Sequence, residues 1–382
     1  MLKPQIIEKG ILQPFLKYKR SRLFRMLNIS AGVLTSAGMP VRQSEVIANE
    51  RDRVRPLRIN PGEIEIKYID ADAIYFCIPQ NHFGHILTGT MAFAYILLDK
   101  TYQNHKIIFT PFPNTYNNVP CETTRKMLGY LGVKEENIMV IDEYTQFKSV
   151  VVLELSLRCV RLSRFRKRLF EIDKEFIDTF RTISQKFIDE KSPKKIYFSR
   201  SKFSVRPIMY EDKIEQIFRK NGYEIFYPEA LSLEEQIKLV ANADFYVCLQ
   251  GTLEHHSLFM KDGATFIVMA RKNARTERQV LIDQLQQTIK HIYLSANIQP
   301  FGDKIQPNIV GISKDFIEFF DEYGFTYDKK DCVLTNQEIN DYIEKCSWRD
   351  IPLPRVFLKK LLNWFLLRHF DKLKTNIQSS PQ

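Results

Sequence analysis

The chain has 382 residues, enough for two domains of ordinary size, and its 44% hydrophobic and 26% charged residues are typical of a soluble globular protein. Its six cysteines have neither CxxC nor CxxH spacing, which argues against a disulfide framework or a zinc motif and favours a reducing cytoplasm. No apolar run is long enough for a spanning helix or a signal peptide core, so we expect neither.

The formal charge of +11 is concentrated at the two ends of the chain. Residues 1–26 have a net charge of +6 and residues 355–374 a net charge of +5, so the remainder is neutral overall. A uniformly basic nucleic-acid-binding protein would not show this distribution. Basic residues interleaved with apolar ones favour contact with an anionic membrane surface instead.

Residues 1–50 have no clear periodicity, and we expect an irregular segment with a short helix near residues 20–27. The first half then alternates between strand and helix patterns, which predicts a doubly wound α/β domain. The expected strands are 63–68, 73–78, 106–110, 137–141 and 150–157, and the expected helices are 86–98 and 122–131.

A basic cluster at residues 158–168 interrupts this pattern, and we interpret it as a solvated helix face or a linker. A helix at 174–190 precedes a second domain with the same rhythm. Its expected strands are 195–199, 224–227, 245–249 and 265–269, and its expected helices are 210–220, 232–242 and 277–287. Shorter helices follow at 314–322 and 336–346. The predicted domains are therefore residues 1–190, 191–300 and a helical extension, 301–382.

The C-terminal end of the chain contains an amphipathic pattern with two interpretations. One is an ordinary helix that packs against the first domain, and the other is an interfacial helix that brings the protein to a lipid-linked molecule. The apolar stripe is formed by Phe357, Leu358, Leu361, Leu362, Phe365, Leu366 and Leu373, with Trp364 beside it.

The segment from Ala243 to Gly263 carries the clearest signal of a binding site. An apolar strand pattern ends at Gln250-Gly251-Thr252, and Thr252 is a good N-cap for a helix from Leu253 to about Met260. A strand, a glycine turn and a helix N-terminus form an anion site, because free N–H groups and the helix dipole converge there.

Three titratable residues lie in the first turn of that helix: Glu254, His255 and His256. Glu254 is either a functional carboxylate or a residue that only complements the helix dipole. The two histidines lie about 100° apart around a helix, so only one can face a ligand. Arg200 and Arg206 follow another strand at its carboxyl end, where α/β sheets bind ligands, although surface ion pairs are the simpler alternative.

The second half resembles glycosyltransferase family 61, and the resemblance extends over roughly residues 75–290. The family pattern is matched at Ser199, Arg200, Arg206, Pro228, Glu229, Ser232, Gln236, Ala243, Asp244, Gly251, His255, Leu258 and Phe259. In the first half, Asn81 and His85 match an Asn-x-x-x-His signature before an apolar helix. The chain departs from the family at Gly89, where members commonly have an acidic residue.

The resemblance implies a GT-B fold, with two Rossmann-like domains facing each other across a cleft. It implies that Arg200, Arg206, Glu229, Gln250, Gly251 and Thr252 hold a nucleotide-sugar, with UDP as the expected nucleotide. No metal or other cofactor is expected, because arginines can stabilise the leaving diphosphate. An inverting transfer needs a base, and His85 is the first candidate, Glu254 the second, with His255 beside them. A structural His85 that only caps its helix is the alternative.

The predicted function is therefore that of an inverting glycosyltransferase of the bacterial capsule or exopolysaccharide type. The expected partners are a nucleotide-sugar donor, a glycan or lipid-linked acceptor and an anionic membrane surface, with no nucleic acid. The expected location is the cytoplasm, with peripheral attachment to the inner face of the membrane. Two other classes stay open from the sequence: a polysaccharide pyruvyl transferase and a non-catalytic basic protein of the membrane surface.

Overall fold

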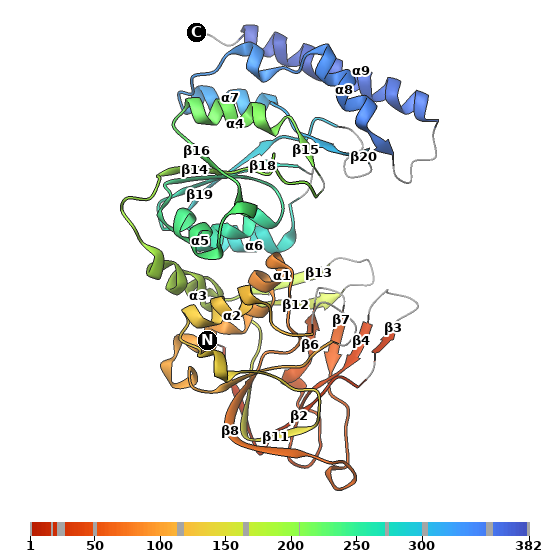
Figure 1. The fold of residues 1–382 in the computed structure, drawn as a ribbon, viewed down its shortest axis with the longest axis vertical. Coiled ribbons are helices and arrows are strands. Elements are labelled where there is room, and N and C mark those ends of the chain that lie inside the picture. The colour runs from red at the N-terminus through yellow and green to blue at the C-terminus, as the bar shows by residue number, and fades with distance from the viewer. Residues whose placement is uncertain are drawn as a thin grey trace. The chain divides into compact units, whose positions relative to one another are not determined.

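The computed structural model of the chain divides into two compact units, Met1–Lys186 and Phe187–Gln382, which we describe separately (Figure 1). The residues that the structure describes are 2–16, 18–20, 27–48, 52–112, 118–162, 168–205, 207–271, 275–299, 305–348 and 354–379. Both units combine parallel strands with helices, as the alternating sequence pattern predicts.

The main sheet of the first unit has the strand order β10-β9-β8-β11-β2-β5, and β1 also pairs with β11. Its strands are β1 (Gln5–Glu8), β2 (Ile11–Gln13), β5 (Gly32–Leu34), β8 (Lys67–Tyr75), β9 (Lys106–Phe109), β10 (Ile138–Val140) and β11 (Thr145–Val152). Strands β8 to β11 are parallel, whereas β1, β2 and β5 join them in antiparallel pairs. This sheet is therefore mixed, and the expectation of an irregular N-terminal segment is wrong. The short helix expected near residues 20–27 falls largely on residues 21–26, which lie outside the described residues.

Two smaller sheets and several helices complete the first unit. One sheet has the order β3-β4-β7-β6, and the other is the antiparallel pair β12-β13. The strands are β3 (Tyr18–Arg20), β4 (Leu27–Ser30), β6 (Val46–Ala48), β7 (Asp52–Arg55), β12 (Leu157–Leu162) and β13 (Arg168–Ile172). The helices are α1 (Phe83–Thr88), α2 (Glu122–Tyr130) and α3 (Lys174–Ser184), with 3-10 turns η1 (Arg42–Ser44), η2 (Pro61–Glu63), η3 (Thr90–Ala92), η4 (Ala94–Leu98), η5 (Lys100–Tyr102), η6 (Glu135–Asn137) and η7 (Gln185–Phe187).

Two local predictions for the first unit are wrong for identifiable reasons. The expected long helix at 86–98 is interrupted at Gly89, whose φ of −123° and ψ of −73° are not helical, and continues as η3 and η4. The basic cluster at 158–168 begins in strand β12 rather than in a helix face or linker. There Arg158 forms ion pairs with Glu154, Glu171 and Asp173, so acidic neighbours compensate its charge.

The main sheet of the second unit is entirely parallel, with the order β16-β14-β17-β18-β19. Its strands are β14 (Lys195–Phe198), β16 (Glu224–Phe226), β17 (Phe245–Leu249), β18 (Thr265–Ala270) and β19 (Lys290–Ser295). Helices α4 (Glu211–Lys220) and α7 (Lys314–Glu322) cover one face, and α5 (Leu233–Asn242) and α6 (Glu277–Leu285) cover the other (Figure 1). This is the doubly wound arrangement expected for the second half.

The strands of this sheet are buried on both faces, which explains their continuous apolar sequences. Tyr197 and Val247 point into a core formed with α4 and α7, whereas Phe198, Tyr246 and Phe266 pack together on the opposite face. Smaller elements complete the unit: β15 (Ile208–Met209), β20 (Ile305–Gln306), β21 (Asn308–Ile309), β22 (Ser347–Trp348), α8 (Asn336–Lys345), α9 (Arg355–Ser379), and the 3-10 turns η8 (Pro228–Ala230), η9 (Thr252–Phe259) and η11 (Lys329–Cys332).

The C-terminal helix α9 belongs to the core of the second unit. Leu362, Leu366, Phe370 and Leu373 are buried in the same cluster as Tyr197 of the central sheet. The segment expected as a separate helical extension thus shares a core with residues 191–300. Of its predicted apolar stripe, Leu358, Leu362, Leu366 and Leu373 are buried in the second unit, whereas Phe357 and Phe365 are exposed. In the described part of the chain, no helix is both long and apolar enough to cross a membrane.

Adjacent leucines on α9 provide a direct test of this packing. Leu366 is 0% exposed and Leu367 is 36% exposed. We expect Leu366→Ala to lower the free energy of unfolding of the second unit by about 2–5 kcal/mol, because it leaves a cavity in the core. Leu367→Ala should cost about 1 kcal/mol or less. Urea unfolding of both variants measures the difference, and equal losses would contradict this orientation of the helix.

Candidate functional site

The strongest candidate site lies at the carboxyl edge of the sheet in the second unit. Phe198 and Cys248 are neighbours in the parallel pairing of β14 with β17. Arg200 and Gly251 therefore leave the sheet at the same edge, each shortly after its strand ends. The strand order reverses between β14 and β17, and open α/β sheets bind ligands in the crevice at such a point.

The turn after β17 differs in detail from the prediction. Gly251, not Thr252, is the N-cap residue, and Thr252 is the first residue of the 3-10 helix η9. Gly251 has a φ of +143° and a ψ of −145°, a conformation that favours glycine. Glu254 reaches back to this turn, and its Oε1 accepts a hydrogen bond from the Gly251 N–H at 2.6 Å. The Gly251 N–H is thus already used within the chain.

Glu254 is a buried candidate at this edge whose carboxyl pKa is raised. Its side chain is buried, at 2% exposure, and its Oε2 atom has no hydrogen-bond partner among the described residues. Burial raises the pKa of the Glu254 carboxyl to about 7, although the Gly251 N–H and the nearby Arg275 and Arg271 oppose the increase. A carboxyl group that titrates near neutral pH can exchange protons with a reacting group.

Two arginines follow strands of this sheet at the same carboxyl edge, and one of them, Arg271, lies beside the Gly251 turn. Arg200 is half-buried, and its guanidinium lies 4.9 Å from the ring of Phe203. Arg271 follows β18, the next strand of the sheet, and its guanidinium would lie 3.5 Å from a Cβ atom on Gly251. The buried Nε of Arg271 has no partner in the part of the chain that the structure describes. Arg206, the other predicted ligand, lies outside the described residues.

Two buried carboxylates of α4 hold the turn that carries Arg200. Glu215 accepts a hydrogen bond from Ser199 at 2.5 Å and others from Ser201 and from Tyr227. Glu211 accepts from the Arg200 N–H at 3.1 Å and from Tyr197 at 3.0 Å.

Burial raises the pKa of Glu211 to about 7, opposed by the Arg200 N–H and the Tyr197 hydroxyl. Its second oxygen has no partner in the described chain. Glu211 and Glu215 thus accept hydrogen bonds from the turn that carries Arg200, so its backbone is fixed before any ligand binds.

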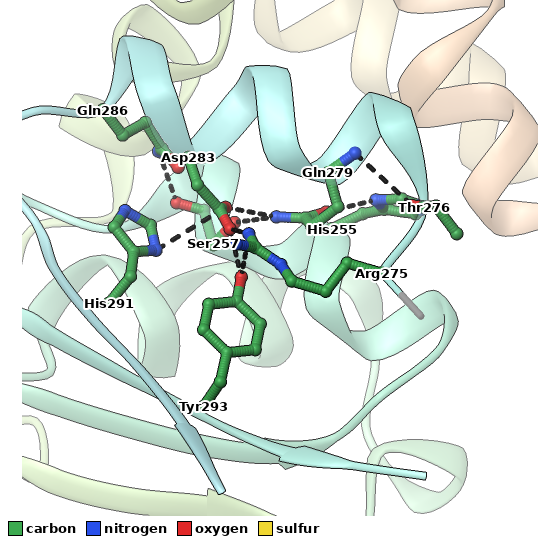
Figure 2. Close-up of polar contacts among 9 residues, drawn as sticks. All are labelled: His255, Ser257, Arg275, Thr276, Gln279, Asp283, Gln286, His291 and Tyr293. Carbon is green, nitrogen blue, oxygen red and sulfur yellow. Dashed lines mark hydrogen bonds and ion pairs between the residues drawn. The ribbon is translucent and has the colours of Figure 1, made fainter. Parts of the chain in front are cut away.

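His255 is part of a polar network that extends from η9 to β19 (Figure 2). Its Nδ1 lies 2.9 Å from Gln279 Oε1, and Gln279 donates to Asp283 at 2.7 Å and to Ser257 at 3.2 Å. Asp283 also forms an ion pair with Arg275.

Around Asp283 the same network continues into β19 (Figure 2). Tyr293 donates to Asp283, and its ring lies 3.7 Å from the Arg275 guanidinium. His291 Nδ1 lies 3.5 Å from Asp283 Oδ1, a distance beyond a good hydrogen bond, and burial lowers the pKa of His291. The network explains why Arg275 is anchored beside the turn.

The remaining residues of the predicted segment have clear positions. His256 is buried against Phe198, and its Nε2 lies 2.9 Å from Gln236 Oε1. Burial lowers the pKa of His256 to about 3, so the ring is neutral and its role is packing. Glu229 is exposed in η8, shortly after β16, and Gln250 is buried directly after β17.

The sequence matches the family model of glycosyltransferase 61 over residues 13–267. The chain belongs to glycosyltransferase family 61. This membership makes it a glycosyltransferase, and the matched region includes His85, Arg200 and the Gly251 turn. Arg271, Arg275 and all of α9 lie beyond its end.

Two other comparisons add little to the family assignment. A search of curated proteins finds no match. Among solved structures, the chain is similar to the dodecameric iron-containing heptosyltransferase TibC in complex with ADP-D-β-D-heptose, with 11% identity, a TM-score of 0.28, and coverage of 96% of this chain and 91% of that chain. A TM-score this low does not establish a shared fold.

The first unit of this family 61 transferase contains the predicted His85 at the carboxyl side of β8. The His85 ring is half-buried in α1, and its centroid lies 5.2 Å from that of the exposed His82. Asn81 connects two loops, since it donates to the Val119 carbonyl at 3.0 Å and accepts from the Cys121 N–H at 3.1 Å. Asn81 therefore has a structural role in shaping the loop before His85.

The departure from the family at Gly89 has a local steric reason. A Cβ atom on Gly89 would lie 2.6 Å from the carbonyl oxygen of His85, closer than real contacts allow. With this backbone the position cannot carry an acidic side chain without rearrangement. In the described residues there is also no group of three or more His, Cys, Asp or Glu side chains arranged to hold a metal ion.

Several site residues were missed by the sequence analysis. Arg271 follows an expected strand at its carboxyl end, so the rule that selected Arg200 could have found it. Glu211 and Glu215 had no such signal, because they look like ordinary polar positions of an amphipathic helix. Only the hydrogen bonds of the folded chain show that these two glutamates contact the turn that carries Arg200.

The raised pKa of Glu254 predicts a pH-dependent stability difference. Between its ordinary pKa of 4.5 and about 7, the folded protein keeps a proton that the unfolded chain has lost. The wild type therefore loses stability as pH rises through this window, and Glu254→Gln does not. We expect the variant to gain up to about 3 kcal/mol relative to wild type between pH 4.5 and pH 8.

Denaturant unfolding of both proteins at the two pH values measures this gain. Glu229→Gln, which removes an exposed carboxylate from the same edge, is the control for the loss of one charge. A difference between wild type and Glu254→Gln that is identical at both pH values would contradict the assignment of a buried, neutral carboxyl.

Proposed function

We propose that this glycosyltransferase transfers a sugar from a UDP-sugar to a hydroxyl of a surface polysaccharide or lipid-linked glycan, with inversion at the anomeric carbon. The observation that carries the proposal is that Arg200, Gly251 and Arg271 follow the adjacent strands β14, β17 and β18 at one edge of the sheet, with the Arg271 guanidinium beside Gly251. A nucleoside diphosphate presents two anionic phosphates, and arginines bind them through several donors at once. UDP is what the family resemblance implies.

The charge at this edge suits a leaving diphosphate. As the bond between the anomeric carbon and the diphosphate oxygen breaks, negative charge develops on that oxygen, and nearby cations lower the energy of the transition state. Arg200 and Arg271 supply positive charge from β14 and β18, the two strands that flank β17. The first N–H groups of a helix have no acceptor within it, so those of Thr252 and Leu253 are further donors in the proposal. No metal or other cofactor is included.

The transfer also requires a base for the acceptor. The base removes the hydroxyl proton as the acceptor oxygen bonds to the anomeric carbon, and the nucleoside diphosphate leaves from the opposite side. His85 is the first candidate, because an imidazole titrates near neutral pH. This role requires the GT-B arrangement, with the Rossmann-like units facing each other across a cleft, and that arrangement is part of the proposal.

Glu254 is the second candidate, and its geometry favours a supporting role. One oxygen already holds the Gly251 N–H, so the carboxylate fixes the turn that receives the diphosphate. His255, next along η9, is held by Gln279 and is proposed to line the same site. Arg206, Gln250 and Glu229 complete the proposed donor site, with Arg206 outside the described residues.

Thermal shift with a nucleotide panel tests the donor site. We expect UDP, but not GDP, CDP, CMP or phosphoenolpyruvate, to raise the melting temperature by several degrees at a concentration about 100 times its Kd. Arg200→Ala should weaken UDP binding roughly 10- to 100-fold, because it removes charge-assisted hydrogen bonds.

The exposed Arg219 of α4 provides the matched control, since Arg219→Ala removes the same charge from another surface. Stabilisation by phosphoenolpyruvate alone would indicate a pyruvyl transferase instead. If no compound in the panel stabilises the protein, the donor-site proposal is wrong.

Turnover assays with the donor identified in this way distinguish the two candidate bases. We expect His85→Ala to lower kcat by roughly 10²- to 10⁴-fold and to leave the Kd of UDP unchanged. His82→Ala, which removes the adjacent exposed imidazole, should have little effect. Glu254→Gln should mainly weaken UDP binding.

A large loss of kcat in Glu254→Gln, with little loss of kcat in His85→Ala, would assign the base to Glu254. In that case kcat would fall as the pH drops below about 7, because the folded carboxyl becomes protonated.

The proposal also includes a location at the cytoplasmic face of an anionic membrane, where a lipid-linked acceptor would be presented. Contact was expected at both basic ends of the chain. Part of the N-terminal one, including residues 17 and 21–26, lies outside the described residues. The C-terminal one is helix α9, which is described through Ser379.

A further inference from the structure

Helix α9 has a buried face that anchors it to the second unit. Leu358, Leu362, Leu366, Phe370 and Leu373 recur at intervals of three or four residues and are 0–2% exposed. Two contacts beside this stripe set the rotation of the helix. Lys359 forms a 2.8 Å ion pair with Glu344 of α8, and His369 Nε2 lies 3.0 Å from the Ile312 carbonyl oxygen.

The opposite face of α9 is also apolar, although a helix packed on a core usually presents a polar face to water. Val356 is 67% exposed, Phe357 is 52% exposed and Trp364 is 49% exposed. At 100° per residue these side chains, together with Leu367, lie on the side away from Leu362. Large apolar groups gathered on one surface indicate an interaction site rather than chance exposure.

Basic side chains lie on the same side of the helix. We call these positions together the outward face of α9: Val356, Phe357, Lys360, Trp364, Leu367, Arg368 and Lys374, with the exposed Lys372 at its edge, about 80° from Leu362. Asp371 is the only acidic residue between Arg355 and Lys374. The Arg368 guanidinium lies 5.0 Å from the Trp364 ring, which keeps a cation beside the aromatic group.

This composition discriminates between possible occupants. A second copy of the chain docked face to face would bring like charges together, which opposes association. The phosphate backbone of a nucleic acid would pair with the basic residues but would leave the Phe357 and Trp364 rings in water. An anionic bilayer satisfies both, because its headgroups attract Lys and Arg and its interface accepts aromatic side chains.

We propose that the outward face of α9 docks in the plane of an anionic lipid bilayer, with Phe357 and Trp364 inserted at the headgroup level. The buried leucines hold the helix parallel to the surface of the second unit. In the proposal the helix therefore lies along the membrane surface and does not cross it. The proposal is independent of the donor chemistry, since none of these residues belongs to the candidate donor site. Of the membrane contacts expected at the two basic ends of the chain, the proposal assigns one to a defined surface, the outward face of α9.

Tryptophan fluorescence tests the insertion directly. The chain has two tryptophans, so Trp348→Phe leaves Trp364 as the sole indole fluorophore. With vesicles of phosphatidylglycerol and phosphatidylcholine, we expect a blue shift of the emission and protection from a water-soluble quencher. Vesicles of phosphatidylcholine alone should produce neither change.

Sedimentation with the same vesicles tests the charge and the aromatic contact in a chain that retains Trp348. Lys360→Ala, Arg368→Ala and Lys372→Ala combined should weaken binding roughly 100-fold, at roughly 5-fold for each cation near the surface. Lys100→Ala, Lys134→Ala and Lys191→Ala combined form the matched control, since these exposed lysines lie elsewhere, and binding should change less than about 2-fold.

Trp364→Ala should weaken sedimentation without altering the melting temperature, because the ring is half-exposed. UDP binding should be unchanged in every α9 variant, so failure here is distinguishable from failure of the donor site. Binding that is equal for both vesicle types, or equally weakened by the control lysines, would overturn the proposal. So would a blue shift that depends on protein concentration without lipid, which would indicate a second copy of the chain.

Discussion

The parallel pairing of β14 with β17 is the contact on which the candidate site depends. It places Phe198 beside Cys248, so that two turns distant in the sequence leave the sheet together. Between β17 and β18, the rings of Tyr246 and Phe266 stack with their centroids 5.3 Å apart, and both side chains are fully buried in the core. Beyond the last ladder hydrogen bond, however, the backbone N–H groups of the turns need other partners.

Buried carboxylates supply those partners, and they determine the electrostatics of the site. Glu211 and Glu254 each accept a backbone N–H from a turn, and burial raises the pKa of both to about 7. Such groups cost free energy when ionised in a dry environment, and nearby cations reduce that cost. Arg271 lies beside the Gly251 turn, so the same arginine that compensates Glu254 is available to an anionic ligand.

The two faces of α9 differ in their surroundings, since one is buried in the second unit and the other is exposed. The inner leucines of α9 complete a core that includes the central sheet, which fixes the helix without any membrane. Its outward face is therefore presented in one orientation, with Trp364 and its neighbours already assembled. A preformed surface loses less conformational entropy on binding than a segment that must fold at the bilayer.

The sequence by itself determined the doubly wound pattern of the second unit, including the capping box of Ser232 and Glu235 at the start of α5. It also placed Arg200 and Gly251 at strand ends, because strands, caps and glycine turns follow from the properties of a few adjacent residues. It failed for the N-terminal strands, which depend on pairing with distant partners such as β11.

Only the tertiary structure decided which residues share the site. The cap of the Gly251 turn is the Glu254 carboxylate rather than Thr252, because burial against the sheet directs that side chain back to the backbone. Arg271 joins Gly251 through the pairing of β17 with β18. Side chains that meet across strands are brought together by long-range pairing, and a local sequence pattern does not encode that pairing.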